Sequence, residues 1–149
     1  MKVYLATDHA GFELKETVKE FLIKEGYEVE DCGAYQYDKN DDYPDFISKA
    51  AEMVSKDPEN SKSIIFGGSG QGEAIVANKF PKVRAAVYYG KAEDMPSLTR
   101  QHNDSNILSL GARFLNEEEA NNAVKLFLDT PFSEDERHIR RIKKIEEIK

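Results

Sequence analysis

The sequence predicts an α/β fold in which one five-stranded parallel sheet lies between two layers of helices. Short β-branched runs alternate with longer amphipathic segments along all 149 residues, and this alternation is typical of right-handed βαβ units. The chain has no internal repeats and no Pro/Gly/Ser-rich linker, so residues 1–149 are expected to form one domain. Hydrophobic residues make up 40% of the chain, which argues against a disordered protein.

The first half of the chain supplies three of the predicted strands. Lys2–Thr7 is an apolar run that ends at a polar segment, Tyr27–Cys32 is a second run closed by Gly33, and Ser61–Phe66 runs directly into a series of glycines. The apolar run Lys2–Thr7 is typical of a strand that a parallel sheet buries on both faces.

Two amphipathic segments connect these three strands. Phe12–Glu25 carries apolar residues at helical spacing, and Gly26 follows it as a C-cap. The polar segment Tyr35–Pro44 is expected to be a loop. Pro44 then opens a second helix, which ends before Pro58.

The second half of the chain completes the sheet. Val83–Tyr88 and Ile107–Leu110 are the fourth and fifth strands, and a helix over Ala92–His102 joins them. Three further helices are expected at Glu73–Phe80, from a capping box of Asn116 with Glu119 to about Asp129, and at Glu134–Ile148.

Charge and residue content exclude several classes of function. The formal net charge is −7, so the chain has no overall attraction for nucleic acid or anionic membrane. No apolar stretch approaches the roughly 20 residues that span a bilayer, and no signal peptide is recognisable, so a cytoplasmic location is expected. A single cysteine excludes an intrachain disulfide, and no two histidines have metal-ligand spacing, so no metal site is expected.

A glycine-rich segment, Gly67–Gly72, follows the third strand. Glycines let successive N–H groups face one anion, although a plain tight turn would use the same residues. Glu73 and Ala74 stand where a P-loop needs Lys and Ser/Thr, and the dinucleotide fingerprint also fails because Glu73 replaces its third glycine. Glu73 itself is either a carboxylate favoured by the helix dipole or a general base.

The C-terminal segment is basic on an otherwise acidic chain. Glu136–Lys149 contains six basic and three acidic residues, a net charge of +3 that leaves −10 for the rest. Arg137 and Arg141 are four residues apart and so share one helix face. Two guanidinium groups there would suit a phosphate, or they could belong to a solvated charged face.

Eight short blocks, in order from Lys2 to about Ile145, carry a family resemblance. They are Asp8-His9-Ala10-Gly11-Phe12-Glu13-Leu14-Lys15, Asp42-Tyr43-Pro44-Asp45, Gly68-Ser69-Gly70-Gln71-Gly72, Ala77-Asn78-Lys79, Arg84-Ala85-Ala86, His102-Asn103-Asp104-Ser105-Asn106, Leu110-Gly111-Ala112-Arg113 and Arg137-His138-Ile139-Arg140-Arg141. Together they resemble ribose-5-phosphate isomerase type B, a family that includes galactose-6-phosphate isomerase subunits and allose-6-phosphate isomerases.

The resemblance implies a Rossmann-like three-layer α/β/α domain that acts as a cofactor-free aldose–ketose isomerase. It also implies a homodimer, with tetramers left open, in which the C-terminal helix reaches the partner subunit and the two subunits share their active sites. The resemblance implies that the phosphate group of the substrate is bound by His9, Arg113 and the partner's Arg137 and Arg141. The residues implied along the sugar are Asp8, Tyr43, His102 as the ring-opening group, Asn103, and the Gly68, Gly70, Gln71 and Gly72 backbone.

One departure from the common family pattern concerns the base. Many members carry a cysteine just before the glycine loop as the group that moves a proton between C1 and C2, whereas this chain has Gly67. The chain resembles a branch that uses glutamate instead, which implies that Glu73 is the base and Ser69 its hydroxyl partner. Cys32 ends the second strand, away from that position, and is expected to be a small buried residue.

Three functions remain distinct at this point. The first is isomerisation of ribose 5-phosphate to ribulose 5-phosphate through an enediolate. The second is the same chemistry on a hexose 6-phosphate, either galactose or allose phosphate. The third is a non-catalytic protein that binds sugar phosphates and has lost its base, which Gly67 favours and the pairing of Glu73 with Ser69 opposes.

Overall fold

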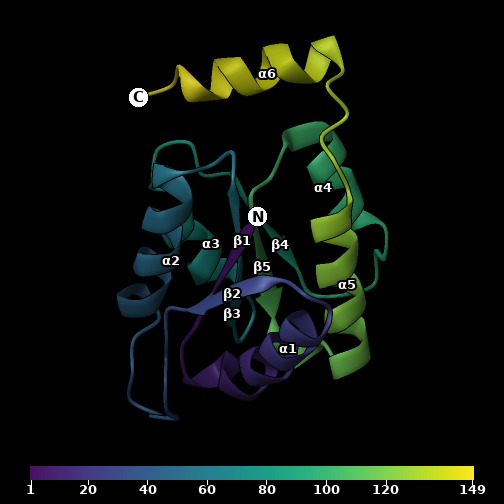
Figure 1. Ribbon diagram of the computed structural model, residues 1–149. Coiled ribbons are helices and arrows are strands. Elements are labelled where there is room, and N and C mark those ends of the chain that lie inside the picture. Colours follow the sequence, from purple (N-terminus) through teal and green to yellow (C-terminus); the bar gives the residue numbers. More distant parts are fainter.

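A five-stranded, wholly parallel sheet forms the centre of the molecule, in the order β2-β1-β3-β5-β4 (Figure 1). The computed structural model describes all residues, 1–149. The strands are β1 (Lys2–Thr7), β2 (Glu28–Asp31), β3 (Ser61–Gly67), β4 (Ala85–Tyr88) and β5 (Ile107–Gly111). Because every neighbouring pair is parallel, all five carboxyl ends lie at one edge. The predicted α/β class is confirmed.

Six helices and two short 3-10 turns connect and extend the strands. They are η1 (His9–Gly11), α1 (Phe12–Lys24), α2 (Pro44–Lys56), α3 (Gln71–Ala77), α4 (Met95–Asn103), η2 (Ala112–Phe114), α5 (Glu117–Asp129) and α6 (Glu136–Glu146). The capping box is confirmed at α5, where the side chains of Asn116 and Glu119 each accept a hydrogen bond from the other's backbone N–H.

Three helices begin at other residues than the sequence pattern predicts. Helix α6 starts at Glu136 rather than Glu134, because the Asp135 side chain caps it by accepting from the Arg137 N–H at 3.0 Å. Helix α3 starts at Gln71 rather than Glu73 and ends at Ala77, because Gly70, with φ of +79°, turns the loop directly into the helix. Helix α4 starts at Met95 rather than Ala92, with Pro96 in its first turn, where a missing N–H costs no helical hydrogen bond.

Alternate residues of the strands build two separate cores. In β1, Val3 and Leu5 pack with residues of α1 and α5, whereas Tyr4 and Ala6 pack with residues of α2. Both faces of the sheet are therefore buried, as the apolar run Lys2–Thr7 predicts. The layers are α1 and α5 on one face and α2 and α3 on the other, with α4 beside α5 (Figure 1).

A fully buried lysine holds the segment that follows β2. Lys15 of α1 donates from Nζ to both carboxylate oxygens of Asp31 at 2.8 Å and to the carbonyl of Ala34 at 2.6 Å. The backbone of Ala34 is also tied to the end of β1, through its N–H to the carbonyl of Thr7 at 2.9 Å. Lys15 thus fixes the start of the loop that leads to α2.

We expect Lys15→Met to lower the free energy of unfolding by about 3–5 kcal/mol, because the substitution leaves a largely buried carboxylate without its main partner. Lys19→Met is the matched control: Lys19 also contacts Asp31, at 3.0 Å, but its side chain is partly exposed. That exposed pair should contribute about 1 kcal/mol or less. Urea denaturation measures both, and equal losses would contradict the structural role given to Lys15.

Helix α6 stands apart from the rest of the fold, beyond the end of the sheet where the chain begins (Figure 1). Its attachments are the buried His138 and an ion pair of 2.7 Å between Arg84 Nη1 and Glu146. Ile139, Ile145 and Ile148, in and just after α6, are exposed. No helix of the protein combines the length and the apolar character that a membrane span requires.

Candidate active site

Polar segments from three neighbouring strands meet at the carboxyl edge of the sheet. Asp8 and His9 follow β1, the glycine loop follows β3, and Arg113 follows β5. The register aligns Gly67 with Gly111, and the N–H of Arg113 donates to the carbonyl of Gly68 at 3.1 Å. The position predicted for a ligand site, outside the carboxyl ends of parallel strands, is therefore the position where these groups gather.

The Glu73 carboxylate fills the space that a side chain at Gly67 would occupy. A β-carbon built on Gly67 would overlap the carboxyl group of Glu73. Glu73 comes from the first turn of α3 and is only 4% exposed. The two positions that the sequence offers for a base, one before the loop and one after it, thus converge on a single point in space.

Burial raises the pKa of Glu73, and the negative charge of nearby Asp8 raises it further. Hydrogen bonds from the backbone amides of Glu73 and Gly70 act in the opposite direction. A carboxylate with a pKa raised from its ordinary value is a stronger base than an exposed glutamate, which suits proton abstraction near neutral pH.

Polar groups from other segments pack closely against the glycine loop. The Gly70 carbonyl accepts a hydrogen bond of 2.7 Å from the Ser109 hydroxyl. The Arg113 guanidinium lies against the α-carbon of Gly68, and the Tyr43 hydroxyl lies against that of Gly72. Substitution at either glycine would displace a neighbouring polar group.

Ser69 and Gln71 lie on the outer side of this loop, and both are exposed. The N–H of Gln71 is 3.4 Å from the Ser69 hydroxyl. The amides of the first turn of a helix have no partner within that helix. The loop therefore presents the N–H groups of Gln71 and Gly72 and the Ser69 hydroxyl beside Glu73.

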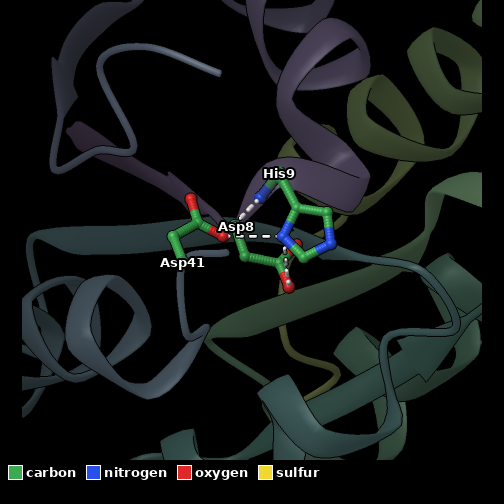
Figure 2. A group of neighbouring side chains, drawn as sticks. All are labelled: Asp8, His9 and Asp41. Atoms are coloured by element: carbon green, nitrogen blue, oxygen red, sulfur yellow. Dashed lines mark hydrogen bonds and ion pairs between the residues drawn. The ribbon is translucent and has the colours of Figure 1, made fainter. Parts of the chain in front are cut away.

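A carboxylate that the sequence analysis missed, Asp41, orients His9. Its Oδ1 accepts from His9 Nδ1 at 2.7 Å and from the His9 backbone N–H at 3.0 Å, and Figure 2 shows both contacts. Asp41 lies in the polar loop before Tyr43, where no local pattern distinguishes it from Asp38 or Asp42. Only the folded loop brings it to His9.

Asp8, His9 and Asp41 each bring one oxygen or nitrogen atom within 4.8 Å of the others. The shortest of these contacts is the hydrogen bond of 2.7 Å between His9 Nδ1 and Asp41, so hydrogen bonding and charge hold the group together. Spacing along the chain does not predict this group, because Asp41 is distant in sequence from Asp8 and His9.

Four of the predicted site residues lie at the opposite, amino edge of the sheet. Asn103 ends α4, and its carbonyl accepts from Nε of Arg84, just before β4, at 3.0 Å. His102 stacks on His138 of α6, with ring centroids 4.7 Å apart. The length of β5, roughly 13 Å at the usual rise per residue, separates this group from Gly111. One chain therefore does not bring His102, Asn103, Arg137 and Arg141 to Glu73.

Arg137 and Arg141, two of the three arginines of α6, are exposed, as the predicted shared helix face requires. Arg137 has one carboxylate near it, Asp135 at 3.5 Å. Burial lowers the pKa of the adjacent His138, and the charge of Arg137 lowers it further, so the buried ring is neutral at neutral pH and adds no charge of its own.

Cys32 and a cavity between β4 and α5 lie outside the candidate site. Cys32 is buried in the core under α2, and burial raises the pKa of its thiol to about 11, which leaves it protonated and inert. A cavity of about 480 Å³ between β4 and α5 is lined by Tyr88 and Glu119 among others and holds none of the predicted site residues.

A family model and a known relative each match nearly the whole chain. The family described as Ribose/Galactose Isomerase matches residues 3–145. Ribose-5-phosphate isomerase B of Mycobacterium tuberculosis is 44% identical over 142 residues, which cover 95% of this chain and 86% of that protein.

Two solved structures share the fold at similar identity. Ribose-5-phosphate isomerase B of Mycoplasma genitalium, with bound ribulose-5-phosphate, has a TM-score of 0.93 and 37% identity, covering 97% of this chain and 93% of that one. The ribose 5-phosphate isomerase of Thermotoga maritima has a TM-score of 0.90 and 42% identity, covering 99% and 98%. From its sequence, its fold and the groups gathered at its carboxyl edge, this chain belongs to the ribose/galactose isomerase family.

Proposed function

We propose that this protein interconverts ribose 5-phosphate and ribulose 5-phosphate. The observation that carries the proposal is the buried Glu73 carboxylate, which occupies the missing side-chain position of Gly67 beside the glycine loop. The similar Mycoplasma genitalium structure has ribulose-5-phosphate bound, which supports a pentose phosphate as the ligand here.

Glu73 is the base that moves one proton between adjacent carbons. It takes the proton from C2 of the open-chain aldose, the electron pair forms the C1–C2 double bond, and the negative charge passes to O1. After a proton shifts from O2 to O1, Glu73 returns its proton to C1 and O2 becomes the ketone oxygen. One carboxylate within reach of both carbons is sufficient, because the group that takes the proton from C2 is then in the protonated form that C1 requires.

The loop stabilises the enediolate between these two transfers. The Ser69 hydroxyl and the amides of Gln71 and Gly72 would donate to O1 and O2 as negative charge develops there, while the Gly70 amide stays with the Glu73 carboxylate. Asp8 and Tyr43, on the two sides of the loop, line the path of the sugar, and Gly68 lies beneath the Arg113 guanidinium, where that cation can reach the phosphate.

A second copy of the chain completes the site in a homodimer. Charged groups at the amino edge of one subunit would face the open carboxyl edge of the other, so that the partner's Arg137 and Arg141 join His9 and Arg113 at the phosphate. The position of α4 beneath α6 (Figure 1) supports the partner as the source of His102 and Asn103 as well. His102 would then open the furanose ring by transferring a proton between O1 and the ring oxygen.

The proposal is tested by offering the purified protein ribose 5-phosphate, galactose 6-phosphate and allose 6-phosphate in deuterated water. We expect turnover of ribose 5-phosphate with deuterium entering at C1 or C2, because the proton on Glu73 exchanges with solvent during the enediolate step. NMR follows both the product and the label. Turnover of a hexose phosphate alone would move the substrate assignment to the hexose branch, and binding without label would contradict catalysis altogether.

A further inference from the structure

The loop between β2 and α2 places a buried carboxylate against a histidine at the candidate site. The Asp41 side chain is 9% exposed, and its Oδ1 accepts both the ring Nδ1 and the backbone N–H of His9. Its other oxygen, Oδ2, is buried and has no hydrogen-bond partner. Burying an unpartnered carboxylate oxygen is costly, so the two bonds to His9 are what offsets that cost.

This contact determines which ring nitrogen of His9 is free. With Nδ1 donating to Asp41, the other nitrogen, Nε2, points away from both carboxylates in Figure 2. A carboxylate on one ring nitrogen fixes the ring orientation and favours the protonated form. His9 is then a two-ended donor, with Nδ1 held by Asp41 and Nε2 directed into the open edge of the sheet.

The other charged groups around His9 have mixed effects. Asp8, at the end of β1, lies 4.0 Å from Nδ1 and favours the cation, whereas Arg113 of η2 opposes it. The ring of Tyr37 meets His9 edge-on, with centroids 6.3 Å apart, and carries no charge at neutral pH. The hydrogen bond to Asp41 is the largest influence, and the net effect is that the pKa of His9 is raised.

We propose that Asp41 is a positioning residue that holds His9 as a cation with Nε2 directed at the substrate phosphate. This inference rests on the phosphate role proposed for His9 and extends it to a residue that does not touch the substrate. A cationic histidine attracts a phosphate dianion, whereas a neutral ring offers only an uncharged donor. Phosphate binding should therefore weaken as pH rises through the pKa of His9, and Asp41 sets where that loss occurs.

The test compares Asp41→Asn with the wild-type protein in two measurements. Asn keeps a carbonyl oxygen for both His9 donors but removes the charge. NMR titration of the full chain should show the His9 ring losing its proton at lower pH than in the wild type. At a pH between the His9 pKa of the variant and that of the wild type, KM of Asp41→Asn for ribose 5-phosphate should be about tenfold higher than that of the wild type, with kcat unchanged. This is the expected cost of converting one charge-assisted hydrogen bond into a neutral one.

Two further variants keep the result interpretable. Asp38→Asn removes the same charge from an exposed residue of the same loop and should leave both measurements at wild-type values. Asp41→Glu restores the charge and should recover part of the shift. Unchanged titration in Asp41→Asn, or an equal effect of Asp38→Asn, would overturn the inference.

Arg113→Ala separates this inference from the proposed function. If Arg113→Ala raises KM while Asp41→Asn does not, the phosphate site stands and the role of Asp41 is wrong. If neither variant changes KM, the phosphate is bound elsewhere, and both the placement of the substrate and the role of Asp41 fail together.

Discussion

Replacing Glu73 with Gln is expected to lower kcat by about 10²–10⁴-fold, the usual contribution of a positioned general base, with little change in KM. Gln has the same shape as Glu and fills the same space at Gly67, but it cannot accept the C2 proton. Steady-state kinetics measures the loss, and solvent deuterium incorporation into the sugar should fall with it. A variant with undiminished kcat would remove Glu73 from the reaction.

Two companion measurements separate loss of the base from a general disturbance of the site. Gly67→Ala leaves Glu73 in the sequence but places a methyl group where its carboxylate lies, so kcat should fall by about 10²-fold through misplacement of the base. In the wild type, kcat should fall as pH drops through the pKa of Glu73. Because burial raises that pKa, this loss occurs at higher pH than it would for an exposed glutamate.

The second large effect is expected at α6, where Arg137→Ala should raise KM by roughly 10²-fold, since a charge-assisted contact to phosphate is worth about 1.5–3 kcal/mol. Lys143→Ala is the matched control, because it removes a charge from another face of the same exposed helix. An equal rise of KM in Lys143→Ala would show that the effect comes from the net charge of the helix and not from a contact of Arg137 with the phosphate.

Mixing the two inactive variants tests whether sites are shared. When Glu73→Gln and Arg137→Ala chains are dissociated and reassembled together, each mixed dimer has one site with both defects and one site with neither. Random pairing should then restore about a quarter of wild-type activity at low substrate, as two-fold symmetry requires. Failure to recover activity from demonstrably mixed dimers would contradict a site built from two chains.

The sequence predicts the sheet well because most strands are largely apolar runs and each crossover has helical periodicity; the edge strand β2, with the sequence EVED, is the exception. Two of the three helix starts that it misplaces, at Gln71 and Met95, depend on a glycine with positive φ and on a proline that fits the first turn. Neither is visible in apolar spacing. Periodicity thus identifies the buried face of an element, while backbone chemistry decides where the element begins.

The candidate site is only partly readable from the sequence. Strand order places Asp8, Glu73 and Arg113 at one edge, because parallel strands share their carboxyl ends. The contact of Asp41 with His9 spans 32 positions in sequence and comes from an irregular loop, so no spacing rule predicts it. Likewise, motif resemblance groups His102 with Glu73, and only the direction of α4 shows that one chain holds them apart.

Because α6 lies apart from the carboxyl edge, the rate of turnover is expected to depend on the concentration of the protein in a particular way. Chains too scarce to pair would hold the Glu73 base without the arginines that bind the phosphate. By mass action the paired fraction grows with concentration, so turnover would rise more steeply than the number of chains until pairing saturates. With the proposed shared site, a single chain would be inactive and activity would appear when two chains associate.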